Sequence, residues 1–455
     1  MSTSTSSELV GTEVLPPSST PAWMAALDGS PRRRLAISAA VLFLLLVITR
    51  LIADADQLTA STTIGLTLRL AAPILMAGLA ALWAERSGIV NIGIEGMMIL
   101  GTWFGAYGAW YGPTLIGKIG LGTPPDWTAP WIGFVFGIVG GMLGGLIHAV
   151  ATVRFNVDHV ISGVAMNLLA FGGMRYLSEL TFVGEEGGGI SQSPKQVAAF
   201  PKFNVPVLGG GKIFGWESPD ALGSLEKHHW FVVSDLAGVI RGFVIDMSWA
   251  TVVCYSFVAI SVYVLWRTRF GLRLRSSGED PGAAESLGVK IVRLRYAGML
   301  ASGGFAGLGG AYLSIVSSSY YRQGQTANRG FIGIATTIFG NWRPTGVLGG
   351  ALLFGFSDAI KLLSPDSLTA LFLFATFVAG LVTILGFYRK KLVRGISAGV
   401  VAVLFLIVYL TVDKVPDSLT QAAPYLITLV VLATASQRLR PPAFAGKPWR
   451  PGDSH

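Results

Sequence analysis

Apolar runs separated by short polar stretches recur along almost the whole chain. The first begins at Leu35, and the others lie near residues 63–84, 89–110, 130–151, 158–182, 248–267, 296–316, 329–340, 347–363, 369–388, 396–412 and 420–437. Most contain about 20 residues, the length that an α-helix needs to cross a hydrocarbon core about 30 Å thick. The pattern predicts an all-α, polytopic integral membrane protein with about ten to twelve transmembrane helices.

One of these runs is too short to cross a membrane. At about 1.5 Å per residue, the stretch from Gly330 to Gly340 covers roughly half of the hydrocarbon core. Residues 340–346, Gly-Asn-Trp-Arg-Pro-Thr-Gly, then interrupt any helix. Broken helices at membrane depth occur where they line a cavity or are buried in protein. We therefore expect a half-helix at this point.

Composition supports the membrane assignment. Hydrophobic residues make up 52% of the 455 residues and charged residues 13%, against about 25% charged residues in soluble domains. Glycine is frequent, and pairs spaced four residues apart (Gly101 and Gly105, Gly303 and Gly307) predict close helix packing. The single cysteine, Cys254, excludes a disulfide framework and any multi-cysteine metal site.

The basic residues divide unevenly between the two sides of the predicted membrane. With the N-terminus inside, 21 Lys and Arg lie in inner segments and 9 in outer ones, in keeping with the positive-inside rule. The net charge of +9 therefore reflects topology, and no nucleic acid is expected as a partner. Both termini are predicted to be cytoplasmic.

Three regions follow from this topology. Residues 1–30, rich in Ser, Thr and Pro, are expected to be a disordered cytoplasmic tail. Residues 31–440 form the transmembrane domain, whose first helix imitates a signal peptide but follows too long a polar stretch to be one. Residues 441–455 form a cytoplasmic C-terminal tail.

The longest outer segment, 183–247, contains the pair His228-His229. Adjacent histidines rarely share one metal ion, and no third ligand stands nearby, so no metal site is predicted. A loop of this length usually has a function or is partly disordered.

Motifs for covalent chemistry are missing from the sequence. It has no Gly-x-Ser-x-Gly elbow and no His-Glu-x-x-His pair. Gly112–Lys118 matches the first part of a phosphate loop, but Ile119 stands where a Ser or Thr would bind Mg²⁺. We expect a non-enzymatic chain that binds no cofactor itself.

The inner segment 268–295 predicts a short amphipathic helix. Glu279 and Asp280 suit a helix start and Pro281 its first turn, so we expect a short helix from about Pro281 to Leu287 that stops at Gly288. The apolar side, Ala283, Ala284 and Leu287, has no core of its own to enter. The segment is either a solvated loop or a docking helix for a cytoplasmic partner.

Residues 271–288 and 293–311 resemble the coupling loop and following helix of bacterial ABC-importer permeases for branched-chain amino acids, ribose-type sugars and nucleosides. Residues 84–98, 338–346 and 442–449 are similar to the nucleoside-type permeases that work with a basic-membrane lipoprotein. The chain departs from that pattern in its long N-terminus, its enlarged 183–247 segment and an extra span near 396–412.

The resemblance implies a set of partners. A separate cytoplasmic ABC ATPase would carry ATP and Mg²⁺, a second permease subunit would complete a dimer, here a heterodimer, and an external lipoprotein would deliver a small polar solute. The membrane would be the bacterial plasma membrane. The implied contact with the ATPase comprises seven residues of the short helix and its ends: Gly278, Glu279, Asp280, Ala283, Ala284, Leu287 and Gly288.

Polar residues inside apolar runs mark a candidate solute pathway. Glu95 lies about ten residues beyond the inner boundary, where a carboxylate is costly in lipid, and Asn91 stands one turn earlier. Asn167 and Arg69 complete the candidate set. The alternative for Glu95 is a structural clamp, with Arg69 or Arg86 as its partner.

The sequence thus predicts the membrane subunit of an ATP-driven importer, first for nucleosides and next for simple sugars. The alternatives are a secondary transporter that uses Glu95 as a proton or cation site, and an intramembrane enzyme, for which no catalytic set can be assembled.

Overall fold

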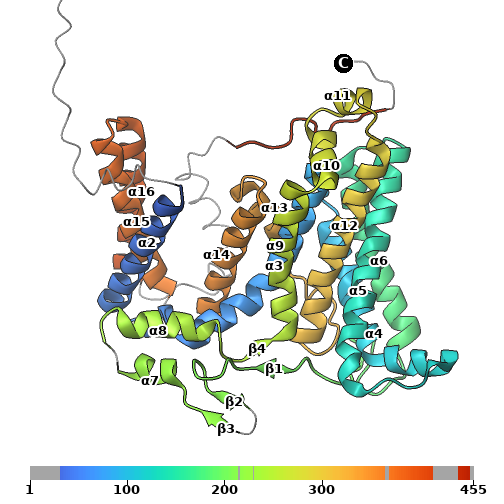
Figure 1. Cartoon of the computed structure of the whole chain (residues 1–455), viewed down its shortest axis with the longest axis horizontal. Helices are drawn as coiled ribbons and strands as arrows, with labels where there is room; N and C mark the ends of the chain where they lie inside the picture. Colours follow the sequence, from blue (N-terminus) through green and yellow to red (C-terminus); the bar gives the residue numbers. More distant parts are fainter. Residues whose placement is uncertain (1–30, 214–215, 229, 364–367, 413–438, 451–455) are drawn as a thin grey trace, which may run out of the picture.

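The computed structural model describes residues 31–213, 216–228, 230–363, 368–412 and 439–450, which form a bundle of long helices (Figure 1). The predicted tail 1–30 and the apolar run near 420–437 lie outside these residues. The membrane-length and half-length helices are α2 (Pro31–Ala53), α3 (Ser61–Arg86), α4 (Ile94–Ile116), α5 (Ala129–Ala149), α6 (His159–Phe182), α9 (Trp249–Arg267), α12 (Ile291–Tyr312), α13 (Arg329–Phe339), α14 (Pro344–Leu363), α15 (Leu368–Tyr388) and α16 (Leu392–Thr411).

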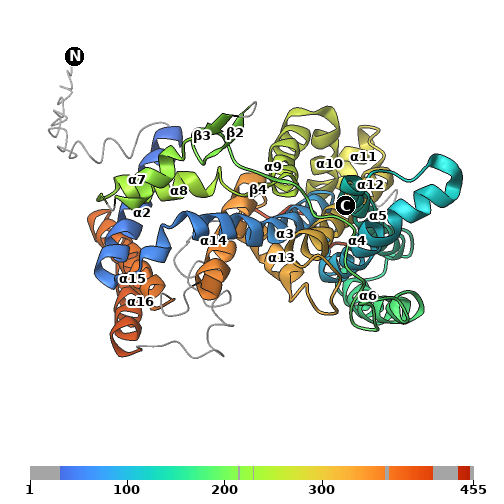
Figure 2. The same ribbon diagram turned by 90° about the horizontal axis from the view of Figure 1, so that it is seen from below.

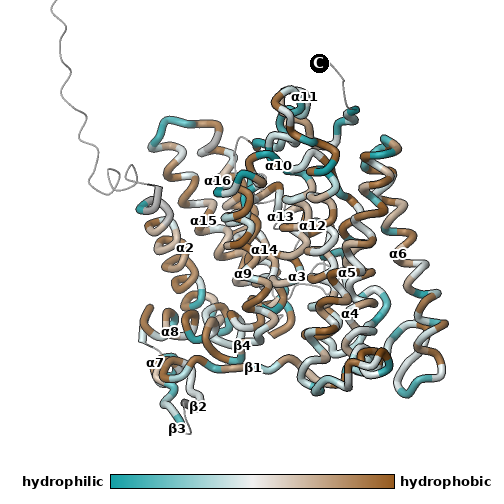
Figure 3. Tube along the Cα trace, turned by 45° about the vertical axis from the view of Figure 1, so that its right-hand side comes forward, coloured by the Kyte–Doolittle hydropathy of each residue, from teal (hydrophilic) through white to brown (hydrophobic). Residues whose placement is uncertain are grey.

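Eight helices of the described part of the chain are long and apolar enough to cross a membrane. They are α2, α3, α5, α6, α9, α12, α14 and α15, and α13 and α16 contain shorter apolar stretches. Hydrophobic residues follow the length of the bundle, and hydrophilic residues gather at its two ends (Figure 3). The predicted polytopic all-α membrane fold is confirmed.

Helices α3 and α12 lie inside the bundle, whereas α2, α6 and α15 lie at its rim (Figure 2). Glycines bring α4, α5 and α12 into backbone contact. A Cβ atom on Gly101 would collide with the backbone of Gly307, and one on Gly141 would collide with the carbonyl oxygen of Gly303. The predicted close packing at these spacings is therefore confirmed.

The predicted half-helix is α13, with 11 residues. Asn341 and Trp342 both have positive φ, 50° and 54°, so the backbone reverses before α14 begins at Pro344. Proline suits the first turn of a helix because that turn needs no donor from its amide. The sequence 340–346 thus ends one helix and starts the next.

The segment 183–247 is largely ordered. Strand β1 (Lys202–Phe203) pairs antiparallel with β4 (Met247–Ser248), and β2 (Gly211–Ile213) pairs antiparallel with β3 (Trp216–Ser218). Helices α7 (Ala221–Lys227) and α8 (Val233–Gly242) follow β3. His229 lies outside the described residues, among which no group of three potential metal ligands is found.

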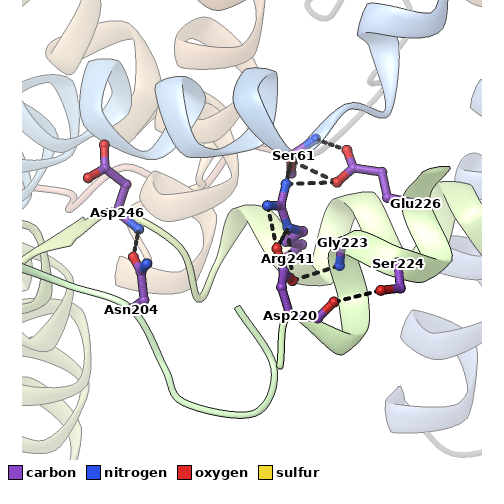
Figure 4. Close-up of polar contacts among 8 residues, drawn as sticks. All are labelled: Ser61, Asn204, Asp220, Gly223, Ser224, Glu226, Arg241 and Asp246. Atoms are coloured by element: carbon purple, nitrogen blue, oxygen red, sulfur yellow. Dashed lines mark hydrogen bonds and ion pairs between the residues drawn. The ribbon is translucent and has the colours of Figure 1, made fainter. Parts of the chain in front are cut away.

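Arg241 of α8 joins this segment to the start of α3 (Figure 4). Its guanidinium donates to Asp220 Oδ2 at 2.6 Å, Glu226 Oε2 at 3.0 Å and Ser61 Oγ at 2.9 Å. Burial alone would raise the pKa of Asp220, but hydrogen bonds from Arg241 and the Gly223 amide lower it below the usual 3.8. The ion pair therefore stabilises the fold at neutral pH and weakens only as the pH falls through that lowered pKa.

Replacing Arg241 by glutamine should loosen the segment, because Asp220 and Glu226 would be left without their shared cation. We expect a loss of about 1–2 kcal/mol of local stability, allowing for partial solvent screening. Hydrogen exchange of residues 216–228 and 230–242 should accelerate. Lys202→Gln is the matched control: Lys202 and Asp246 form an ion pair at 3.1 Å with both side chains about half exposed, so exchange should stay unchanged. Equal exchange in both variants would contradict this role of Arg241.

Candidate functional site

A buried break separates α3 from α4, and side chains of α6 hold it. Gly88 has φ of 98°, so the chain turns away from α3 at this point. Asn167 of α6 accepts a hydrogen bond from the Gly96 amide at 2.7 Å and donates to the Ile92 carbonyl at 3.1 Å. One backbone amide and one backbone carbonyl near the break are therefore paired with the same side chain.

The carboxylate of Glu95 caps the half-helix α13. Its two oxygens accept hydrogen bonds from the backbone amides of Asn328, at 3.0 Å, and Gly330, at 2.7 Å. An acidic group at a helix N-terminus is favourable because it pairs with free amides and with the positive end of the helix dipole. The break before α4 and the start of the half-helix α13 thus meet at one buried residue, Glu95.

Asn91 lies in the break and is also buried. Its Nδ2 donates to Ser302 Oγ of α12 at 2.9 Å, whereas its Oδ1 has no hydrogen-bond partner among the described residues. Asn91, Glu95 and Asn167 are therefore brought to one region of the bundle. Arg69 is not: it forms an ion pair with Asp246 at 3.2 Å, half-exposed, toward the 183–247 segment.

The two arginines considered as clamp partners of Glu95 bind elsewhere. Arg69 pairs with Asp246, and Arg86 donates to the Trp342 carbonyl at 2.8 Å and forms an ion pair with Glu279 at 3.2 Å. That expectation was wrong because the partners of Glu95 are backbone amides, which have no signature in a sequence.

Several polar residues around the break were not identified from the sequence. His159 Nδ1 accepts from the Val90 amide at 3.3 Å, and His148 lies 2.9 Å from Ser162 Oγ. Glu85 accepts a hydrogen bond from the Trp342 indole. The signal that could have found them is the same one that marked Glu95, a polar residue within an apolar run.

At the other candidate site, α10 (Arg269–Glu279) leads into α11 (Pro281–Ser286). The carboxylate of Asp280 caps α11 by accepting from the Ala283 amide at 2.9 Å, and Gly288 ends the turn with φ of 79°. The predicted short helix is confirmed, one residue shorter at its end. Leu287 is 84% exposed, and Ala283 is exposed as well.

The expectation that the apolar side of α11 enters no core was wrong for Ala284. Ala284 is buried against Ile291 and Trp449, with Phe444 packed beside them. Residues 439–450 lie across this end of the bundle (Figure 1): the Phe444 amide donates to the Gly278 carbonyl at 2.9 Å, and the Ala443 amide to Glu279 Oε2 at 3.2 Å. The seven candidate residues therefore divide into two groups. Two are buried, Gly278 and Ala284, and five are exposed: Glu279, Asp280, Ala283, Leu287 and Gly288.

Comparison with known proteins places these features in a family. Residues 63–381 match the family described as "Branched-chain amino acid transport system / permease component". The chain belongs to this family. The permease is a transport subunit. The matched residues include the break before α4, the half-helix α13 and helix α11.

Curated relatives agree with this. The permease is 31% identical over 332 residues to the guanosine ABC transporter permease protein NupQ of Bacillus subtilis, covering 71% of this chain and 91% of the relative. It is 30% identical to the nucleoside ABC transporter permease protein NupC of Lactococcus lactis, with coverage of 79% and 88%. A putative glucose ABC transporter permease, TsgC13 of Haloferax volcanii, is 31% identical, with coverage of 67% and 78%. No solved structure gives a significant match.

Trp449→Ala should destabilise the permease, because Trp449 is buried over Ala284 and Ile291 and its ring lies 5.4 Å from the Arg295 guanidinium. Loss of a large buried aromatic ring costs about 3 kcal/mol. The thermal unfolding midpoint of the purified permease should fall by several degrees. Arg440→Ala, an exposed position in the same segment whose printed contact is through its backbone amide, should leave the midpoint unchanged. An unchanged midpoint for Trp449→Ala would show that this packing contributes nothing to stability.

Proposed function

We propose that the permease is the membrane-spanning subunit of an ATP-driven importer of nucleosides in the bacterial plasma membrane. The observation that carries the substrate class is the similarity, over more than two thirds of the chain, to permeases named for guanosine and for nucleosides. A separate ABC ATPase would supply the energy, with ATP and Mg²⁺ bound on that partner and no cofactor on this chain.

The proposed solute pathway passes the meeting point of the two broken helices. The N-terminus of α13 has a positive dipole end, and the backbone amides of Asn328 and Gly330, which Glu95 accepts in this structure, would become available to a solute if Glu95 moved away. Polar atoms nearby without partners among the described residues are Asn91 Oδ1, Gln325 Nε2 and Arg329 Nε. A nucleoside, with its hydroxyls and base edges, could pair with such donors and acceptors when the helices shift.

Within this proposal, Asn91, Glu95 and Asn167 control the mobility of the broken backbone and are exposed to solute in at least one state. Arg69, beside Asp246 and the 183–247 segment, would stand at the entrance. The solute would then pass from Arg69 toward the break as access to the pathway alternates between the two sides.

Coupling to the ATPase would use both faces of α11. Asp280, Ala283, Leu287 and Gly288 are exposed and would form the docking surface. Gly278, Glu279 and Ala284 contact residues 443–449 or Arg86 and would carry the displacement into the bundle. Glu279 is well placed for this, because Arg86 also binds the carbonyl of Trp342, which lies between α13 and α14.

The remaining partners follow the same proposal. A second homologous permease subunit would complete a heterodimer, and an external lipoprotein would deliver the solute. Both termini and α11 would face the cytoplasm, in keeping with the predicted distribution of basic residues.

Competition for uptake tests the substrate class. Cells that express the permease with its partner subunits should take up labelled guanosine, and an excess of unlabelled adenosine or uridine should reduce that uptake strongly. Free ribose and glucose should have little effect, because neither carries a base. Cells that express the partner subunits without the permease serve as the background.

A second candidate, a simple-sugar importer, is favoured by the similarity to the putative glucose permease. The same experiment separates the two: glucose uptake that depends on the permease and is insensitive to nucleosides would replace the nucleoside assignment by the sugar assignment.

A further inference from the structure

Helix α8 presents an apolar face to its surroundings, although it belongs to a polar extramembrane segment. The exposed positions of α8 and its end are Val233, Leu236, Ile240 and Phe243, spaced three or four residues apart, and Trp230 and Phe231 precede them. Each of these six side chains is between 41% and 58% exposed. A helix bathed in water would place charged residues at such positions, and here none of the six is charged.

The opposite face of α8 is fixed to the ends of two spanning helices. Asp235, 2% exposed, accepts from Arg50 Nη1 of α2 at 2.9 Å and from Thr59 Oγ1 at 2.6 Å. A Cβ atom on Gly238 would lie 2.7 Å from the Thr59 carbonyl oxygen, so the two backbones are in close contact. The level of α8 along the bundle is therefore fixed where the span of α2 ends and that of α3 begins.

The axis of α8 lies roughly across the axes of the spanning helices, at the end of the bundle opposite α11 (Figure 1). Seen from below, α8 lies toward the rim beside α2, not over the centre of the bundle (Figure 2). A helix at this level and in this direction runs within the plane of a membrane surface.

The neighbouring surface of α2 is apolar as well. Leu51 and Ile52, at the same end of α2 as Arg50, are 54% and 58% exposed, and the span of α2 is the least buried of the eight. The apolar face of α8 thus continues a surface that a spanning helix presents to lipid.

We propose that α8 is an interfacial helix whose apolar face, residues 233, 236, 240 and 243, is inserted into the lipid leaflet at this end of the bundle. Trp230 suits the headgroup region, because its ring is apolar and its indole N–H can be hydrated, and Phe231 adds to the apolar surface. The ion pair between Asp235 and Arg50 would fix the depth of insertion. This inference requires only that the chain spans a membrane and does not depend on the transported solute.

Spin labelling in vesicles tests the insertion. Cys254 is the only cysteine and is buried, so a Cys254→Ser background accepts a single label at Leu236→Cys. The permease is reconstituted without partner proteins in vesicles of phosphatidylethanolamine and phosphatidylglycerol. Collisions of the label with oxygen, which concentrates in lipid, are compared with collisions with a water-soluble nickel chelate.

The label at residue 236 should favour oxygen over nickel several-fold, as a label at Leu51→Cys on α2 should, whereas Lys227→Cys on α7 should favour nickel. Ile240→Cys, one turn along the same face, replaces Leu236→Cys if the latter does not reconstitute. A nickel preference at 236 equal to that at 227 would overturn the proposal. So would protection from both reagents, which would point to a protein surface as the occupant.

Discussion

Glu95→Ala is expected to remove most of the folded permease. The carboxylate of Glu95 is buried and accepts two backbone amides at the start of α13, so the alanine variant leaves both amides unpaired. Each unpaired buried amide costs about 1–3 kcal/mol. Yield in detergent and the thermal midpoint should both fall sharply. In Glu95→Gln, the side-chain oxygen can still accept one of the two backbone N–H groups, but the side-chain NH₂ group faces the other. We therefore expect an intermediate loss of yield and of thermal midpoint.

Uptake per folded molecule separates the roles of Glu95. If Glu95 also lines the solute pathway, surviving Glu95→Ala molecules should transport far more slowly than wild type, and Glu95→Gln should retain part of the rate. If Glu95 carried a proton or cation, the glutamine variant would be as inactive as the alanine variant, because ionisation would be essential. Normal uptake per folded molecule in both variants would leave Glu95 as an anchor of α13 only. Wild-type stability together with normal uptake would contradict both roles.

Leu287→Asp should abolish ATP-driven uptake without affecting the fold. Leu287 is 84% exposed on α11, so the permease itself loses no packing, whereas a charge buried in an apolar contact with the ATPase would cost about 3 kcal/mol, roughly a hundredfold in affinity. Co-purification of the ATPase with the permease should be lost. Ala284→Arg is a poorer probe of docking, because Ala284 is covered by Trp449 and the substitution would disturb the fold.

Val393→Asp is the matched control for Leu287→Asp. Val393 is also 84% exposed, and it lies near the turn between α15 and α16, at the same end of the bundle as α11 (Figure 1). The control should bind the ATPase and support uptake normally. If Leu287→Asp retained the ATPase as well as Val393→Asp does, α11 would not be the docking helix.

Most of the fold could be predicted because its signals are local. Run length and hydropathy located the spans, and the glycine-rich sequence after Phe339 located the end of α13. Asp280, Pro281 and Gly288 bounded α11 closely. Glycine spacing predicted close packing, although it could not pair Gly101 with Gly307, since the choice of neighbour depends on the whole bundle.

What could not be predicted depends on contacts between distant residues. Trp449 covers Ala284 across a long stretch of sequence, and no periodicity relates the two. Glu95 was identified as a costly buried carboxylate, but its partners are main-chain amides that any residue provides. The order within 183–247 depends on ion pairs such as Arg241 with Asp220, in which each residue by itself is unremarkable for a surface loop.

The energy source of transport tests the central claim most directly. The permease, its partner permease and the ATPase are reconstituted in vesicles with the binding protein and labelled guanosine, and uptake is measured with ATP, with a non-hydrolysable analogue and with an imposed proton gradient. We predict uptake with ATP alone, none with the analogue, and none with the gradient in the absence of ATP. Guanosine accumulation driven by the gradient without ATP would contradict the assignment as an ATP-driven importer.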